Sequence, residues 1–252
     1  MASHKLKTIV IFGGTSDIAN ACLHQWLKKE NFKILLVGRD YSRIKASADN
    51  LSARYPNSIF EYIESDLLKS NSIQALTTSL FERHEINIAL IAHGNLSNQE
   101  KCQIDLNYCE KELIINGLSA CLISEAVSLA FTKQGSGILA VIGSVAGDRG
   151  RKSNYTYGAA KGLVDIYVQG LQHKFYKTPI NIILIKPGPT DSAMTKHLLN
   201  EKGSLANISH VAKIIVKGIQ NKKQVIYTPR RWMIIMLIIK ALPKFIFNKL
   251  NI

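Results

Sequence analysis

The sequence predicts a single α/β domain built on a doubly wound parallel sheet. Three observations lead to this expectation. Apolar runs of strand length alternate with helical stretches along most of the chain. A glycine-rich turn separates the first apolar run from the first helix. No repeat, linker or low-complexity segment interrupts the alternation, and 252 residues suit one doubly wound unit.

The composition restricts the classes of protein to consider. The net charge of +14 favours an anionic partner, but no nucleic-acid motif accompanies it, so nucleic acid is not expected as a partner. No signal peptide precedes the first strand, which predicts a cytoplasmic protein. The four cysteines show no CxxC pair and no metal-type spacing with histidine, so we expect free thiols and no metal site: Cys22, Cys102, Cys109 and Cys121.

The first expected strand, residues 8–12, leads into a turn that is typical of dinucleotide sites. It reads Gly13-Gly14-Thr15-Ser16-Asp17-Ile18-Ala19, and a helix follows to about residue 30. In a strand, tight turn and helix of this kind, backbone amides at the helix N-terminus hold a pyrophosphate. We therefore expect cofactor contacts along this turn, from Gly13, Thr15, Ser16, Asp17 and Ile18.

The end of the second strand, residues 33–37, predicts which cofactor is bound. In dinucleotide enzymes an acidic residue here binds the ribose hydroxyls, whereas an arginine accommodates the 2′-phosphate. Gly38 stands at the acidic position and Arg39 follows it. NADPH is therefore expected in preference to NADH, although Asp40, one residue later, keeps NAD open as the alternative.

Residues 144–161 hold the expected chemistry. Tyr157 and Lys161 are four residues apart, so they share one face of a helix that continues through residue 170. A lysine ammonium beside a phenol favours the phenolate, which makes the phenol a usable acid or base. Ser144 follows a strand at residues 137–142 and is expected to hydrogen-bond a substrate oxygen.

This serine, tyrosine and lysine, together with the glycine-rich turn, resemble the short-chain dehydrogenase/reductase family. The resemblance implies a Rossmann fold and a nicotinamide cofactor. It also implies that Tyr157 donates a proton to a carbonyl oxygen that Ser144 hydrogen-bonds, and that Lys161 lowers the pKa of Tyr157 and binds the nicotinamide ribose. Asn116, on a long helix over residues 105–131, matches the family asparagine that holds a helix kink and a proton relay.

The same resemblance implies further cofactor contacts after the strands at residues 59–63, 87–92 and 180–185. These contacts are Asp66, Leu67, Gly94, Pro187, Gly188 and Ser192. Several positions depart from the family pattern. Asp17 and Ala19 stand where the family has glycines, and Asp17 brings a carboxylate near the phosphates. Ser192 replaces a threonine but keeps the hydroxyl, and His93 precedes Gly94, where we expect it to form a pocket wall or contact substrate.

The remaining elements are assigned from local pattern. A helix is expected at residues 72–84, an exposed polar loop at 95–103 and a substrate lid at 194–206. Ser209 is expected to cap a helix to about residue 220, and the last strand lies at 224–227.

The C-terminus departs from a plain reductase, so the chain divides into a reductase domain, residues 1–229, and a hydrophobic basic tail, residues 230–252. Residues 232–239 (WMIIMLII) are apolar on every side but too few to span a bilayer. Pro243 is expected to end the first helix, and an amphipathic piece follows. Such a tail contacts lipid, a subunit interface or the pocket. We expect peripheral contact with the inner face of the membrane in a homo-oligomer, a dimer or tetramer.

The tail and residues 151–154 resemble those family members that reduce the 2-keto group of a polyprenyl-phosphate-linked sugar in cell-envelope polysaccharide synthesis. Arg149, Arg151 and Lys152 precede Tyr157, so we expect them at the mouth of the site, where they are candidates to bind the phosphate. One alternative is a 3-oxoacyl or hydroxysteroid-type reductase. Another is a non-catalytic scaffold that senses cofactor, although the complete Ser, Tyr, Lys and Asn set argues against it.

Overall fold

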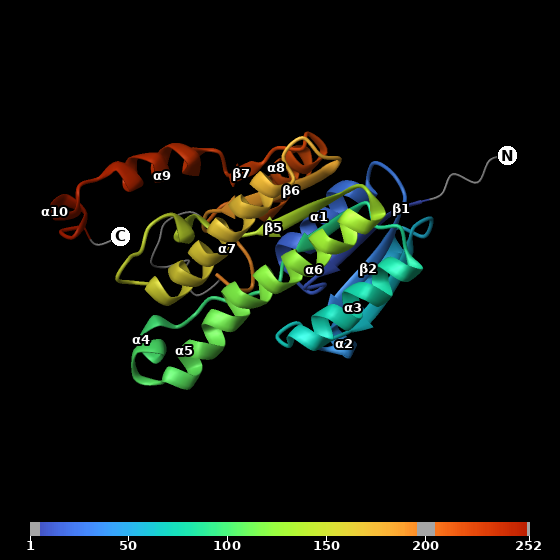
Figure 1. Ribbon diagram of the computed structural model, residues 1–252, viewed down its shortest axis with the longest axis horizontal. Coiled ribbons are helices and arrows are strands. Elements are labelled where there is room, and N and C mark those ends of the chain that lie inside the picture. Colours follow the sequence, from blue (N-terminus) through green and yellow to red (C-terminus); the bar gives the residue numbers. More distant parts are fainter. Residues whose placement is uncertain (1–5, 196–204, 251–252) are drawn as a thin grey trace.

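The computed structural model describes residues 6–195 and 205–250. Within them one seven-stranded, fully parallel sheet has the order β3-β2-β1-β4-β5-β6-β7. Helices cover both faces of this sheet (Figure 1), which confirms the predicted doubly wound fold. The strands are β1 (Lys7–Phe12), β2 (Phe32–Gly38), β3 (Ile59–Glu64), β4 (Ile88–Ile91), β5 (Gly137–Ile142), β6 (Ile180–Pro187) and β7 (Val225–Thr228).

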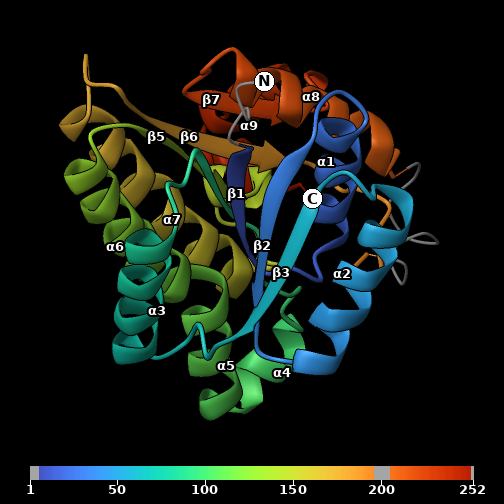
Figure 2. The same ribbon diagram turned by 90° about the vertical axis from the view of Figure 1, so that its right-hand side faces the viewer.

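The two helical layers each bury one face of the strands. Val10 and Phe12 of β1 pack into one core and Ile9 and Ile11 into the other, as the twofold period of a strand requires. Figure 2 shows α1, α2 and α8 on one side of the sheet and α3, α6 and α7 on the other. These helices are α1 (Asp17–Leu27), α2 (Tyr41–Arg54), α3 (Ser70–Arg83), α6 (Ser119–Gln134), α7 (Tyr155–Lys174) and α8 (Ile208–Gln220).

The direction of chain winding reverses at β1. The chain builds β2 and β3 on one side of β1 and then crosses to place β4 on the other side. In sheets of this type ligands bind at the carboxyl ends of the strands beside such a reversal. The turn after β1, at Gly13, and the segment after β4, at His93, therefore lie next to each other and open a cleft.

Several local expectations need correction. The expected exposed loop at residues 95–103 overlaps α4 (Gln99–Ile104), and both Ser97 before this helix and Cys102 within it are buried. The long helix is divided into α5 (Leu106–Leu113), a π-helical segment η1 (Ile114–Leu118) and α6. Asn207, not Ser209, caps α8, because the Asn207 side chain accepts a hydrogen bond from the His210 amide at 3.1 Å. Most of the predicted lid, residues 196–204, lies outside the described residues.

The tail forms two helices, α9 (Arg231–Ala241) and α10 (Lys244–Phe247), separated by Pro243 as expected. They lie at the same end of the molecule as α4 and α5 (Figure 1). Among the described residues, the helical stretch Leu106–Gln134 is long and apolar enough to cross a membrane, but most of it is buried inside the fold, as befits a core helix.

Candidate active site

A cleft of about 1400 Å³ lies at the carboxyl ends of the strands. It exceeds the roughly 300–1,000 Å³ of a typical site for a drug-sized ligand, so a dinucleotide and a second molecule have room together. Residues of α4 (Gln99, Glu100) and of α9 (Arg231, Trp232, Ile235) are among those that line it. The tail is therefore part of the cleft wall.

The cleft brings together most of the residues selected from the sequence. The predicted catalytic residues Asn116, Ser144, Tyr157 and Lys161 line it, and so do His93 and Arg151. Every predicted cofactor residue also lines it: Gly13, Thr15, Ser16, Asp17, Ile18, Arg39, Asp66, Leu67, Gly94, Tyr157, Lys161, Pro187, Gly188 and Ser192. Arg149 and Lys152 are not among its lining residues.

The turn after β1 has the shape that a dinucleotide site needs. Gly13 has a φ of +102°, and a Cβ there would lie 2.5 Å from the His93 backbone nitrogen. Both Gly13 and Gly14 donate their amide hydrogens to the Val37 carbonyl oxygen, at 2.9 and 2.8 Å. Only glycine fits this bend at position 13, so the turn after β1 can pack directly against the segment after β4.

Asp17 serves a purpose that the sequence did not reveal. Its Oδ2 accepts a hydrogen bond of 2.7 Å from the Ala193 amide, in the segment after β6. The carboxylate thus joins the first turn of α1 to the opposite wall of the cleft. The Asp17 carboxylate, which we expected to lie near the phosphates, is therefore hydrogen-bonded to the Ala193 amide.

At the end of β2 two arginines line the cleft. Asp40 Oδ1 accepts a hydrogen bond of 3.0 Å from the Arg43 amide and caps α2. The carboxylate expected to compete with Arg39 is thereby used in a helix cap. Arg43 lines the cleft beside Arg39, and sequence reasoning missed it. The sequence did contain a signal for this position, because Arg43 lies three residues after Asp40, where the first turn of a capped helix begins.

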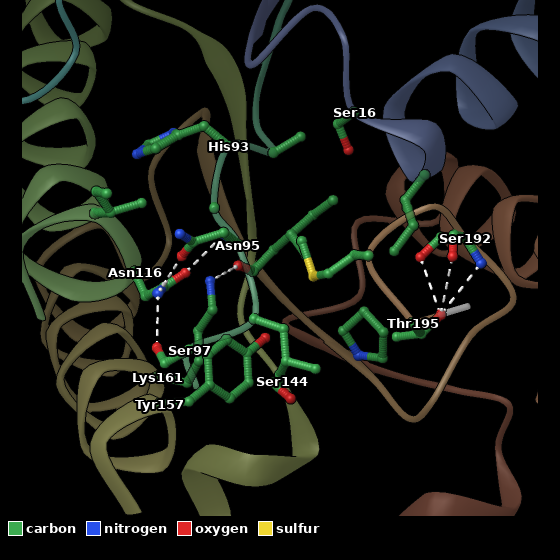
Figure 3. A pocket seen from close by; sticks show the side chains of 18 of the residues that line it. Ser16, His93, Asn95, Ser97, Asn116, Ser144, Tyr157, Lys161, Ser192 and Thr195 are labelled. Carbon is green, nitrogen blue, oxygen red and sulfur yellow. Dashed lines mark hydrogen bonds between the residues drawn. The ribbon is translucent and has the colours of Figure 1, made fainter. Parts of the chain in front are cut away.

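Ser144, Tyr157 and Lys161 converge on one part of the cleft (Figure 3). Burial raises the pKa of Tyr157, while a hydrogen bond with Ser144 lowers it. Burial lowers the pKa of Lys161 to about 8, and its Nζ donates to the Ile142 carbonyl oxygen at 3.2 Å. The Lys161 Nζ lies 5.9 Å from the centre of the Tyr157 ring. Burial therefore dominates both groups here, and the expected lowering of the Tyr157 pKa by Lys161 is not seen.

Asn116 lies in the π-helical segment η1, and its side chain is completely buried. Its Oδ1 accepts from the Asn95 amide at 2.9 Å, and its Nδ2 donates to Asn95 Oδ1 at 2.7 Å (Figure 3). A π-helical turn therefore interrupts the regular helix at the residue where the family resemblance implies a kink.

Glu112 is a buried acid that sequence reasoning missed. It lies in α5 and is only 2% exposed. It accepts hydrogen bonds from Asn95 Nδ2 at 2.9 Å, Ser97 Oγ at 2.8 Å and Asn116 Nδ2 at 3.2 Å. The sequence contained a signal for this contact, because residues four apart on a predicted helix, here Glu112 and Asn116, lie on one face. These bonds fix the Asn116 amide from behind.

His93 points toward α6 (Figure 3). Its Nε2 lies 2.8 Å from Ser119 Oγ, which itself donates to the Leu67 carbonyl oxygen. Because the hydroxyl hydrogen of Ser119 is used there, Nε2 of His93 is the donor to Ser119. Burial lowers the pKa of His93 to about 3, so the ring is neutral. His93 therefore connects the end of β4 to α6 and forms a wall of the cleft.

The three basic residues before Tyr157 have different surroundings. The Arg149 guanidinium donates to the carbonyl oxygens of Ile239 and Leu242, the latter at 2.8 Å, and lies 3.7 Å from the Phe247 ring centre. The expectation that Arg149 lies at the mouth is corrected, because it anchors the end of α9 instead. Lys152 is exposed outside the cleft, whereas Arg151 is partly buried within its wall.

A buried ion cluster holds the loop that follows Ser144. Lys186 of β6 pairs with Asp148 and Asp165, and all three side chains are at most 11% exposed. Asp148 belongs to the short 3₁₀ helix η2 (Val145–Asp148) and Asp165 to α7. Tyr227 donates a further hydrogen bond of 3.1 Å to Asp148 Oδ2. The cluster thus joins the Ser144 loop to the helix that bears Tyr157.

The tail contributes Trp232 to the cleft wall. Its indole packs so closely on Gly188 that a Cβ on Gly188 would lie 2.0 Å from Trp232 Nε1. Met236 is completely buried, while Met233, Ile234 and Leu237 are each more than half exposed. One side of α9 therefore packs over the pocket, and the other side is open to solvent.

The sequence is similar to one protein family over most of its length. The sequence model for "short chain dehydrogenase" matches residues 7–203. An uncharacterized oxidoreductase of Streptomyces coelicolor is 24% identical over 99% of this chain and 98% of its own length. An uncharacterized oxidoreductase of Mycobacterium tuberculosis strain H37Rv is also 24% identical, over 96% of each chain.

Solved structures share the fold at lower identity. A short-chain dehydrogenase from Sphingobium yanoikuyae, in complex with NADPH, has a TM-score of 0.81 and 21% identity, over 95% of this chain and 97% of its own. A "bulky-bulky ketone specific alcohol dehydrogenase" from Comamonas testosteroni has a TM-score of 0.78 and 20% identity, over 98% of this chain and 95% of its own.

The lowered pKa of Lys161 predicts a pH-dependent stability in the absence of cofactor. Its folded-state pKa is about 8, against an ordinary 10.5. Between these values the unfolded chain binds more protons than the folded chain, so stability rises as the pH rises. Relative to Lys161→Met, the free energy of unfolding of the wild type should increase by on the order of a few kcal/mol across this window.

Urea unfolding at a series of pH values measures this difference. Lys152→Met is the matched control, because it removes an exposed lysine outside the cleft. A wild-type minus Lys161→Met difference that stays flat between the two pKa values would contradict the prediction.

Proposed function

This chain belongs to the short chain dehydrogenase family, and from that premise we propose that it is an NADPH-dependent reductase of a ketone. The observation that supports this most is the convergence of Ser144, Tyr157, Lys161 and Asn116 on one cleft beside a dinucleotide turn. A protein that only senses cofactor does not need a buried phenol and a hydrogen-bonded serine facing the same space, so the scaffold alternative is less favoured.

The residues of the cleft fit a bound NADPH. Glycine at position 13 lets the turn after β1 pack directly on the backbone of His93, where a Cβ would lie 2.5 Å from the nitrogen. Arg39 and Arg43 offer two cations for a 2′-phosphate, while Asp40 is engaged in its helix cap. Two solved relatives of the fold are described as complexes with NADPH and NADP. In this proposal the turn after β1 binds the pyrophosphate, Asp66 and Leu67 the adenine side, and Pro187, Gly188 and Ser192 the nicotinamide side.

NADPH, when bound, supplies the hydride that reduces the carbonyl carbon. Tyr157 donates the proton to the carbonyl oxygen, and Ser144 donates a hydrogen bond to that oxygen. Burial keeps Tyr157 protonated at neutral pH, which suits an acid in the reducing direction. Lys161 binds the nicotinamide ribose and returns a proton to Tyr157, and Asn116 keeps the relay in place with Glu112 behind it.

For the substrate we propose a ketone carried on a lipid-linked phosphate sugar. The chain resembles decaprenylphosphoryl-2-keto-erythro-pentose reductase in residues 13–16, 151–154 and 243–247. The apolar outer face of α9 supports a lipid nearby. A 3-oxoacyl or hydroxysteroid-type reductase is the alternative. Turnover of NADPH and NADH with polyprenyl-linked and free keto substrates distinguishes the two.

In the same proposal residues 1–229 form the reductase domain and residues 230–252 a tail that docks on the inner face of the cytoplasmic membrane. The apolar residues Met233, Ile234, Leu237, Ile238 and Phe245 are each more than half exposed. No acidic residue follows Glu201, whereas lysines and arginines flank these side chains. Such a surface favours anionic lipid. The protein would act there as a homo-oligomer.

Tyr157→Phe should leave the fold and cofactor binding intact and abolish most turnover. Loss of a general acid commonly costs about a hundredfold to ten-thousandfold in rate. The measurement is steady-state reduction of a ketone by NADPH, with cofactor binding followed by fluorescence. Tyr155→Phe is the control, because Tyr155 is an exposed residue of the same helix outside the cleft. Full activity in Tyr157→Phe would refute the assignment.

Arg39→Ala should weaken NADPH binding much more than NADH binding. A charge-assisted hydrogen bond to phosphate is worth about 1.5–3 kcal/mol, so the Kd for NADPH should rise by about tenfold or more. Titration with each cofactor measures the ratio of the two effects. Lys45→Ala removes a nearby cation that is paired with Asp49 and should change neither Kd. Equal losses for both cofactors would mean that Arg39 does not contact the 2′-phosphate.

The wild type should float with anionic vesicles in a density gradient and detach partly at high salt. The double variant Leu237→Glu/Phe245→Glu should stay at the bottom, because two side chains that are each 70% exposed become charged. Tyr176→Glu, at an exposed position of the reductase domain, should still float. If the wild type itself fails to float, the tail does not bind lipid.

A further inference from the structure

Two of the four cysteines lie together where α4 meets α5 (Figure 1). Cys102, in α4, is buried, whereas Cys109, in α5, is partly exposed. The side chain of Cys102 interacts with both the Cys109 thiol and the Thr156 hydroxyl. Cys109 Sγ lies 3.9 Å from the same hydroxyl oxygen. The two sulfur atoms and the Thr156 hydroxyl therefore form one cluster.

The other two cysteines are placed differently. Cys22 packs in the core on one face of the sheet and Cys121 in the core on the other face, so the sheet lies between them. Two cysteines can be joined only where their side chains already face each other at close range. Of the four cysteines, all of which the structure describes, Cys102 and Cys109 are the pair whose thiols interact.

The thiol pair lies beside the start of the helix that bears Tyr157. The first amides of a helix have no acceptor within it, and in the described part of the chain the preceding residue, Asn154, provides no side-chain cap. Gln99 of α4 takes that role, because its Oε1 accepts a hydrogen bond of 2.9 Å from the Thr156 amide. Its Nε2 also donates to the Thr156 hydroxyl at 3.2 Å. The cap of α7 and Cys102 therefore lie one turn apart on the same short helix.

The two thiols differ in their surroundings. Burial raises the pKa of Cys102, which keeps this side chain a protonated thiol. Cys109 is the more exposed of the two, so a small oxidant in solution reaches it more easily. A sulfenic acid that forms beside a second thiol condenses with it to a disulfide. Cys109 is therefore suited to react with the oxidant, and Cys102 to complete the bond.

We propose that Cys102 and Cys109 form a reversible disulfide when the protein meets a peroxide, and that this bond slows the enzyme by displacing the cap of α7. The Cys109 sulfur attacks a peroxide oxygen, so an S–O bond forms, the O–O bond breaks and water leaves. The Cys102 sulfur then attacks the Cys109 sulfur. An S–S bond forms, the S–O bond breaks, and the hydroxide leaves as water with the Cys102 proton. Two thiols are thereby oxidised and one hydrogen peroxide is reduced to two waters.

The disulfide acts on the site through α4. A covalent bond holds the two sulfur atoms closer than two thiols lie, so Cys102 moves toward Cys109 and away from Thr156. Gln99 moves with Cys102, since both belong to the same six-residue helix. The Thr156 amide then loses its acceptor, one residue before Tyr157. The effect on turnover rests on the proposed reductase function, whereas the disulfide and the loss of the cap do not.

Peptide mapping tests the disulfide directly. Trypsin cleaves after Lys101 and Lys111, so both thiols fall on the one peptide of residues 102–111. The protein is treated with hydrogen peroxide, and the remaining thiols are then alkylated before digestion. The peptide should carry no alkyl group and should be lighter than its reduced form by two hydrogen atoms. Treatment with dithiothreitol before alkylation should reverse both changes.

Single substitutions identify the partners. Cys102→Ser and Cys109→Ser should each prevent the loss of two hydrogen atoms. Cys22→Ala is the matched control, because it removes a cysteine from the core and leaves the pair intact. Melting temperatures show whether each variant is folded, and the peptide map of the wild type decides the matter if a variant does not fold.

Two measurements on the wild type test the effect on α7. Hydrogen exchange at the Thr156 amide should be roughly threefold to tenfold faster in the oxidised protein, which is what the loss of one hydrogen bond supplies. Turnover of a ketone with NADPH should fall by about tenfold or more, since a small displacement of a catalytic group can cost about a hundredfold. Dithiothreitol should restore both, and peroxide should leave the turnover of Cys109→Ser unchanged.

Each part of the inference has a result that overturns it. A peptide that keeps both thiols, or that joins a second molecule instead, overturns the disulfide. Unchanged exchange at Thr156 or unchanged turnover after the bond has formed overturns the link to α7, and so does an equal loss of turnover in peroxide-treated Cys109→Ser. If the reduced protein reduces no ketone, the proposed reductase function fails, while mapping and exchange still decide the disulfide and the loss of the cap.

Discussion

The geometry of the candidate site depends on the buried Lys186 and its two carboxylates. Moving an ammonium and two carboxylates out of water is costly, and their attraction compensates only when the geometry is good and the remaining oxygens are hydrogen-bonded. Tyr227 meets part of that need at Asp148. The result is a fixed joint between β6, the loop after Ser144 and α7. Loss of one partner would leave a buried charge unpaired, so the three elements hold together as a unit.

That joint places Ser144 and Tyr157 in a part of the cleft where burial governs their chemistry. Burial raises the pKa of the phenol and lowers that of Lys161, so each group is shifted toward its neutral form. The neutral phenol is the form that can donate a proton. Behind it the Asn116 amide is fixed by Glu112 and Asn95 in a network of side-chain hydrogen bonds. The site is therefore ordered before any ligand arrives, which lowers the cost of binding.

The tail shows how one helix can belong to a pocket and to a surface together. Trp232 and Ile235 of α9 line the cleft, while Leu237 and Ile238 are exposed. Arg149 connects the far end of α9 to the loop after Ser144. The helix is apolar on every side because one side lines the cleft and the other forms an exposed apolar surface. The same connection means that displacement of α9 would reach the catalytic loop directly.

The sequence by itself determined the alternation of strands and helices, the Gly13 turn and the shared helical face of Tyr157 and Lys161. These features depend on local backbone preference and on spacing within a few residues, which is information that a single stretch contains. It could not determine that Arg149 binds the end of α9, ninety residues away, that Asp17 holds Ala193, or that Trp232 covers Gly188. Those contacts exist because the folded sheet brings distant side chains together. A charged or aromatic side chain in a loop has many possible partners in sequence, and only the tertiary structure selects one.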